Sequence, residues 1–243
     1  MSAEFEILHE GLTIRYRLTA GRSRAGTVSL RVRRDGQVLV SVPPRVPAAF
    51  AHRLVREKAD WIAGHLKTVA ALPAPPLPEE RFEHGTMHAL FGQDYPLMLM
   101  RHDKARPVVG FDGEAIRIHT RDAAPEVLAD ALTRWYRQQL SARIAQDLRE
   151  LAATMPWVDA LPAFRLKDMR TRWGSCSGRG NLNFNLHLVK APPVAIRYVV
   201  LHELCHLAEM NHGERFWRLV EERMPAWREH RTWFKTHGHR LMT

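Results

Sequence analysis

Segment 193–210 constrains the fold of this chain most, because it places ionisable side chains inside a strongly apolar helix. Such a helix lies inside a protein rather than on its surface. His202, Glu203 and His206 interrupt it, and burying them is costly unless a metal ion or hydrogen bonds satisfy them. The apolar positions that cover most of its circumference are Ile196, Val199, Val200, Leu201, Leu204 and Leu207.

The three polar residues follow the pattern H-E-x-x-H. At about 100° per residue, a separation of four residues brings the imidazoles of His202 and His206 within about 40° of each other on one face. Two neutral imidazoles one turn apart can reach a single tetrahedral zinc ion. Glu203 flanks this stripe, where it can take a proton from a metal-bound water molecule. The pattern therefore predicts a Zn²⁺ cofactor with Glu203 as the catalytic base.

Two residues compete for the place of a third metal ligand. Glu209 shares a helical face with His202, but it lies about 10 Å further along a straight helix, too far for one metal ion. His212 stands between Asn211 and Gly213, which both tolerate the left-handed backbone that would end the helix and return the chain. We therefore favour His212 as the ligand. Glu209 is then either solvated or accepts a hydrogen bond from a ligand imidazole.

A turn-rich segment at 172–176, with the sequence RWGSC, precedes this helix. Arg172 is a candidate catalytic residue, because a guanidinium group could stabilise an oxyanion. The alternative is a structural turn, in which Trp173 packs in the core and Cys176 is a small buried apolar residue. Cys205 is expected to be buried in the helix, although both thiols could serve as extra metal ligands or as a redox switch.

The segment NLNFNLHLVK at 181–190 predicts a strand with apolar and polar faces. If it lies at the edge of a sheet, it could pair with an extended peptide. Its expected polar face carries Asn183, Asn185 and His187, the last as a solvated residue. Near the end of the sequence, three further histidines could donate a hydrogen bond to a transition state, but we expect them to be exposed: His230, His237 and His239.

The first third of the chain predicts a separate region rich in strands. Residues 28–42 alternate apolar and polar side chains around Asp35-Gly36, which indicates a β-hairpin. Helical spacing follows over 47–70. The segment LPAPPLPEE at 72–80 is a linker candidate, because proline sustains neither helices nor sheets. We therefore expect a boundary near residue 75, with a β-hairpin and helix region before it (1–75) and a catalytic domain after it (76–243).

The second region predicts mixed strands and helices, and the expected fold class is α+β. Strands are indicated over 81–120 and 162–168, and a long amphipathic helix over 125–154. Two further helices fit 213–224 and 226–237, divided by Pro225. The sequence shows no internal repeat.

Charge and composition limit the partners and the location. Lys and Arg exceed Asp and Glu by 36 − 26 = 10, which favours nucleic acid or acidic surfaces as neighbours, or else indicates a generally basic solvated surface. With two cysteines, a disulfide framework is excluded. No signal-peptide pattern and no apolar run of about 18 residues is present, so we expect a cytoplasmic protein without membrane association.

The motifs together resemble a known family. HELCHL followed by NHGERFW, and preceded by RWGSC and NLNFNLHLVKAP, is similar to the YgjP-like metal-dependent hydrolases, relatives of the SprT-like zinc metallopeptidases. The resemblance extends to the N-terminal hairpin and the helix that carries Trp61. It implies a zincin-like catalytic domain, zinc ligands at His202, His206 and His212, and a catalytic Glu203. Family members often have serine where this chain has Gly213, which alters turn preference more than chemistry.

Three functions follow as hypotheses. The leading one is hydrolysis of peptide bonds in a peptide or protein substrate by a zinc-activated water molecule. A second is a nucleic-acid-associated protein whose basic surface binds DNA, with a secondary or structural zinc site. A third is a structural zinc site in an inactive scaffold, which would require a fourth protein ligand such as Cys176.

Overall fold

The computed structural model describes residues 3–20, 27–33, 36–70, 82–103 and 106–242. Its secondary structure is mixed α+β, as the sequence predicts. The chain divides into two compact units, Met1–Pro75 and Pro76–Thr243. The predicted linker at 72–80 lies outside the described residues. Within the described ranges, no helix is long and apolar enough to cross a membrane.

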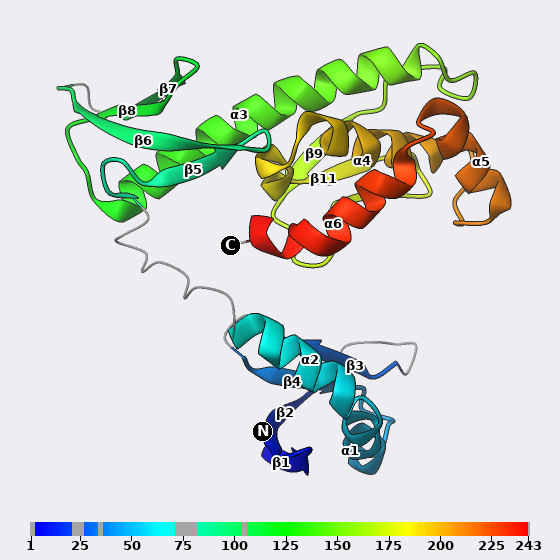
Figure 1. Ribbon diagram of the computed structural model, residues 1–243. Helices are drawn as coiled ribbons and strands as arrows, with labels where there is room; N and C mark the ends of the chain where they lie inside the picture. Colours follow the sequence, from blue (N-terminus) through cyan, green and yellow to red (C-terminus); the bar gives the residue numbers. More distant parts are fainter. Residues whose placement is uncertain (1–2, 21–26, 34–35, 71–81, 104–105, 243) are drawn as a thin grey trace. The chain divides into compact units, whose positions relative to one another are not determined.

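The first unit is a four-stranded sheet with two helices packed on one face (Figure 1). The strand order is β1-β2-β4-β3, with β2 and β4 parallel and the other neighbours antiparallel. The core between sheet and helices includes Ile14, Val40, Val55 and Ile62. The elements are β1 (Ala3–His9), β2 (Leu12–Ala20), β3 (Ser29–Val32), β4 (Val38–Val42), α1 (Ala48–Glu57) and α2 (Ala59–Ala70).

The predicted hairpin is confirmed, whereas the predicted single helix is wrong. β3 and β4 pair antiparallel around Gly36, whose φ of 77° needs the freedom of glycine. Asp35 lies outside the described residues. The helix expected over 47–70 breaks at Lys58 (φ −104°, ψ 14°) into α1 and α2. The buried positions continue at helical spacing across the break (Ala51, Val55, Ala59, Ile62), so periodicity alone predicts one helix.

In its described residues, the second unit combines two sheets with four α-helices and a 3-10 helix (Figure 1). Its first sheet has the order β5-β6-β8-β7, and its second has the order β10-β11-β9. The predicted strands over 81–120 and near 162–168 are confirmed, and so is the long helix α3. The elements are β5 (Met87–Leu90), β6 (Gln93–Arg101), β7 (Val108–Phe111), β8 (Ile116–Thr120), α3 (Pro125–Ala152), β9 (Phe164–Lys167), β10 (Gly174–Cys176), β11 (Leu182–Asn185), the 3-10 helix η2 (Leu186–Lys190), α4 (Pro193–Cys205), α5 (Glu214–Arg223) and α6 (Trp227–Leu241).

The two units repeat one arrangement of strands, although the sequence shows no internal repeat. Each has an antiparallel hairpin, a parallel pair and a second antiparallel pair, in the same order. The first hairpin of each turns through two left-handed residues, Glu10-Gly11 (φ 47° and 77°) and Phe91-Gly92 (φ 50° and 87°). Strand pairing and turn geometry repeat while the side chains differ, and a sequence comparison cannot detect such a repeat.

In the second unit this turn is attached to the segment that leads into α4. The Phe91 N–H donates to the carbonyl of Val189 (2.8 Å), and the Gly92 N–H donates to that of Lys190 (3.2 Å). A Cβ at Gly92 would lie 2.9 Å from Pro192 Cα, so only glycine allows this approach. The first sheet therefore supports the start of α4.

The second sheet corrects two predictions. The segment RWGSC, expected as a turn, contains the short strand β10, which lies at one edge of this sheet in the described part of the chain. The strand expected over 181–190 is shorter: β11 ends at Asn185 and continues as η2. β11 lies in the middle of the sheet, so it is not the edge that could pair with a peptide.

Candidate metal centre

Three histidine side chains converge at the end of α4. His202 lies in the last turn of α4, His206 follows its last residue, and His212 lies in the connection to α5. The Nε2 atom of His212 lies 2.9 Å from Nε2 of His202 and 3.1 Å from Nε2 of His206. Three imidazole nitrogens at one point are the donor set of a metal ion. The sequence prediction of these three residues as neighbours agrees with this geometry.

The path of the chain between the end of α4 and His212 differs from the expected one. The helix expected to reach Met210 ends at Cys205. Hydrogen bonds between residues three apart follow it, among them the one from the Ala208 N–H to the carbonyl of Cys205 (3.1 Å). Gly213 has extended backbone (φ −78°, ψ −173°), and Asn211 is not among the described residues with positive φ. The left-handed turn was therefore the wrong reason for favouring His212.

A backbone hydrogen bond orients His206. Its Nδ1 lies 2.9 Å from the carbonyl oxygen of Glu209, and because a carbonyl only accepts, Nδ1 carries the proton. This tautomer leaves Nε2 free to bind a metal. The hydrogen bond expected from a ligand imidazole to Glu209 is thus accepted by the main-chain carbonyl of that residue. Its carboxylate lies 3.8 Å from Arg215 and is not part of the three-histidine group.

Aromatic side chains from α5 surround the imidazoles. The ring of Phe216 is fully buried and lies 4.5 to 4.8 Å, centroid to centroid, from each of the three histidine rings. Burial lowers the pKa of His202 to about 3, with the neighbouring positive charges adding to this effect. Its buried Nδ1 has no hydrogen-bond partner in the described structure. The imidazole is therefore neutral, as a metal ligand must be.

Glu203 is a buried carboxyl group, with 4% of its surface exposed. Burial raises its pKa from 4.5 to about 8, and the positive charge of Arg172 partly opposes this shift. Its Oε2 atom is buried without a hydrogen-bond partner in the described structure. A carboxyl group with a pKa near neutrality can both accept and return a proton, so its chemistry suits a general base.

Gly174 of β10 is a site residue that the sequence reasoning missed. A Cβ built on Gly174 would lie 2.8 Å from both Cγ and Cδ of Glu203, and closer still to Oε1. Only a glycine lets the strand pass this close to the carboxyl group. The signal was present as the glycine of RWGSC, but nothing local connects that segment to Glu203.

Asn185 holds the segment before β10 in place. Its side chain is fully buried, and its Nδ2 donates to the carbonyls of Met169 (2.6 Å) and Arg172 (3.0 Å). Sequence reasoning predicted Asn185 only as part of a polar strand face. Arg172 itself is exposed, and the effect of its charge on Glu203 indicates that it lies on that side of the site. Its role with an oxyanion stays a prediction.

Trp173 and the cysteines take structural positions. Trp173 packs on Phe234 (ring centroids 4.9 Å apart) and against Gly238 of α6, which confirms the core alternative for this residue. Cys205 is fully buried, and burial raises its pKa to about 12. Burial and the charge of Glu203 raise the pKa of the Cys176 thiol. In the described part of the chain, neither sulfur joins the three-histidine group.

The remaining histidines lie outside this group. His237 and His239 are exposed, as predicted. His230 is half-buried, and its ring lies 6.2 Å from that of Tyr198, so the expectation of an exposed residue is wrong there. His187 is also half-buried rather than solvated, 3.3 Å from Asp168.

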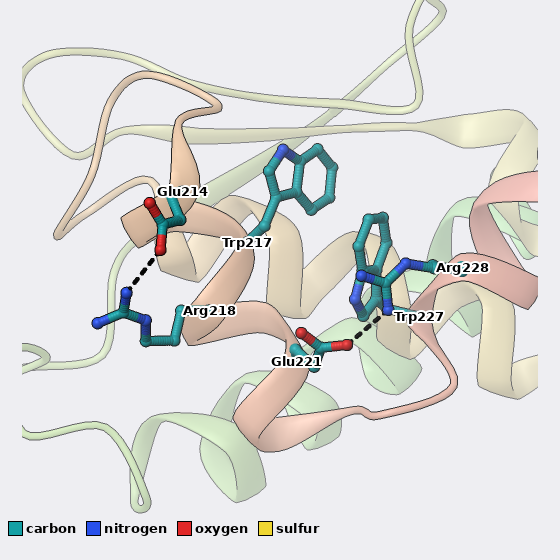
Figure 2. Close-up of a pocket in the computed structure, with 6 residues that line it drawn as sticks. All are labelled: Glu214, Trp217, Arg218, Glu221, Trp227 and Arg228. Carbon is teal, nitrogen blue, oxygen red and sulfur yellow. Dashed lines mark hydrogen bonds and ion pairs between the residues drawn. The ribbon is translucent and has the colours of Figure 1, made fainter.

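A cavity of about 360 Å³ is lined by side chains of α5 and α6, among them Trp217 (Figure 2). Trp217 stacks on His212 (5.7 Å) and on Trp227 (4.2 Å), so one indole ring connects the histidines to the cavity wall. Two ion pairs line the cavity, Arg218–Glu214 (2.9 Å) and Arg228–Glu221 (2.5 Å). Its lining residues are Glu214, Trp217, Arg218, Glu221, Trp227 and Arg228.

Comparison with known proteins gives the class and the family. Residues 26–237 match the model of the YgjP-like metallopeptidase domain, which defines a metal-dependent hydrolase of the metallopeptidase class. The chain belongs to the YgjP-like family. Among solved structures, the metallopeptidase zymogen abylysin of Pyrococcus abyssi is 18% identical, with 40% of this chain and 93% of that chain covered and a TM-score of 0.33. That likeness is too distant to inform the site. No curated protein matches the chain.

Proposed function

We propose that the protein is a zinc metallopeptidase with a zincin-like catalytic site, in which His202, His206 and His212 bind Zn²⁺ and Glu203 is the general base. The observation that carries this proposal is the convergence of three Nε2 atoms, together with the buried carboxyl group of Glu203, the residue that follows His202. Imidazole nitrogen suits zinc, and three protein ligands leave a fourth position for water or substrate, as in catalytic sites. A structural zinc site would need a fourth protein ligand, and the described residues add none to this group.

The chemistry divides between the ion and the protein. When bound, zinc would polarise the scissile carbonyl and acidify a water molecule. Glu203 in its deprotonated form would accept the proton of that water and pass it to the leaving amine, and burial, which raises its pKa, makes this carboxylate a stronger base. Arg172, on the Glu203 side of the site, is the proposed donor to the oxyanion.

The edge of β10 is the proposed pairing site for the substrate backbone. The Asn185 N–H donates to the carbonyl of Trp173, and the Ser177 N–H donates to that of Asn181. In an antiparallel pair, hydrogen-bonded residues alternate, so the main-chain groups of Gly174 and Cys176 point away from β11. An extended peptide that pairs with this edge would lie beside Glu203, which fits a main-chain mode of recognition.

Removal and return of zinc test the function. We expect a chelator to abolish hydrolysis of an unstructured protein such as alkylated casein, and stoichiometric zinc to restore it, because the ion supplies the electrophile. The measurement is the rate of release of new amino groups at each stage. Hydrolysis that continues unchanged in protein shown to be free of metal would contradict the proposal.

The nucleic-acid alternative stays a prediction from the net charge of +10. Its test is the dependence of DNA affinity on salt, because each phosphate contact releases counterions and steepens that dependence.

A further inference from the structure

Arg231 of α6 lies next to the aromatic residues that contact the histidines. Its Cζ atom lies 4.9 Å from the ring centroid of Trp217 and 5.9 Å from that of Trp227. The ring of Trp217 in turn lies 5.7 Å from that of His212 and 5.9 Å from that of His202. A single indole ring therefore contacts both the guanidinium group and the metal-ligand candidates.

The charge of Arg231 has no carboxylate partner among the described residues, whereas four other arginines of α5 and α6 each have one. Its side chain is also exposed, so its N–H groups are accessible. The four paired arginines lie 2.5 to 3.8 Å from a carboxylate oxygen: Arg215 with Glu209, Arg218 with Glu214, Arg223 with Glu222, and Arg228 with Glu221.

The guanidinium group is close to the three histidines. Only the indole ring of Trp217 separates it from the rings of His202 and His212. A positive charge without a carboxylate partner in the described part of the structure attracts, at this distance, an anion bound beside the histidines.

We propose that Arg231 binds a carboxylate of the substrate beside the metal centre, so that the protein prefers peptides that place a carboxylate at this position. The carboxylate is either the C-terminus of the peptide or an Asp or Glu side chain. A guanidinium group stacked on indole faces keeps its N–H edge free, and this edge matches a carboxylate with two parallel hydrogen bonds. This inference rests on the proposed function and adds a substrate class to it.

The test measures binding rather than turnover. Zinc-loaded full-length protein is titrated calorimetrically with two pairs of thiol compounds that bind zinc through sulfur. One pair is mercaptoacetyl-phenylalanine and its C-terminal amide. The other pair is mercaptoacetyl-aspartate α-amide and mercaptoacetyl-asparagine α-amide. Each pair differs only in one carboxylate, so its affinity ratio isolates the contribution of that charge.

We expect at least one pair to show a preference of about tenfold or more for the carboxylate, since hydrogen bonds between charged groups contribute that much. Arg231→Gln should abolish the preference without changing the affinity of the amides, and Arg231→Lys should keep part of it. Arg228→Gln is the matched control, because Arg228 lies on the same helix but is paired with Glu221. The pair that responds identifies the source of the carboxylate.

Two results would overturn the proposal for Arg231 alone. One is equal affinity of the parent protein for both members of both pairs. The other is equal weakening of all four compounds by Arg231→Gln, which would indicate support of Trp217 or of an oxyanion instead. A protein that binds neither zinc nor any of the thiols would overturn the proposed function, and the substrate preference with it.

Discussion

Replacing Glu203 by glutamine is expected to lower kcat/KM for peptide hydrolysis by about 10²- to 10⁴-fold while the protein keeps one zinc ion per chain. Glutamine has nearly the same shape but cannot accept the proton, and the three histidines are unchanged. The measurements are the rate of hydrolysis and the zinc content of the purified variant. Glu114→Gln, at an exposed position in the turn between β7 and β8, is the control and should match the parent.

The same substitution, which lowers activity, is expected to raise the stability of the metal-free protein. The pKa of Glu203 is about 8 in the fold and about 4.5 in an unfolded chain. Between these pH values the unfolded state loses a proton that the folded state keeps, so the parent loses stability as the pH rises from 4.5 to 8. Glutamine does not titrate. We therefore expect Glu203→Gln to be the more stable protein in urea at pH 8, and its advantage to shrink towards pH 4.5.

These two measurements separate chemistry from folding. A variant that is inactive yet folded, zinc-loaded and more stable at pH 8 has lost only the base. Parent-like hydrolysis by Glu203→Gln would show that another group removes the proton. A stability difference that is the same at pH 5 and pH 8 would show that the carboxyl group is not buried as described.

Replacing Gly174 by alanine is expected to reduce both stability and activity. The new Cβ would lie 2.8 Å from Cγ and Cδ of Glu203, so either β10 or the carboxyl group must move. Overpacking of this kind costs about 1 to 3 kcal/mol. A catalytic group displaced by about 1 Å can cost about 10²-fold in rate. Urea unfolding and kcat/KM measure the two effects.

Gly178→Ala is the matched control for that substitution. Gly178 lies in the same RWGSCSG segment, but a Cβ there would have no atom within 4 Å. We expect Gly178→Ala to behave like the parent. If Gly174→Ala also keeps full activity and stability, Glu203 does not pack against β10 in the working protein.

The parts of the site that the sequence predicted are those with a local origin. His202, Glu203 and His206 lie within one helical turn, so spacing alone relates them. The choice of His212 over Glu209 agrees with the three-histidine group, but its two reasons do not hold, because α4 ends at Cys205 and the expected left-handed turn did not form.

The parts that the sequence did not predict depend on tertiary packing. The glycine of β10 lies against a carboxyl group 29 residues later, which no local pattern indicates. The same holds for Asn185, which the sequence places on a polar strand face and which four side-chain hydrogen bonds allow to be buried. The break at Lys58 was missed because the apolar spacing of a helix continues across it. The repeated strand arrangement was missed because the side chains of the two units differ.

X-ray absorption at the zinc edge tests the central claim most directly. Full-length protein loaded with one equivalent of zinc is expected to show three imidazole nitrogens and one oxygen at about 2.0 to 2.1 Å. In His212→Ala, one imidazole should be lost from this set. A sulfur scatterer at about 2.3 Å, or a spectrum that His212→Ala leaves unchanged, would contradict the three-histidine site.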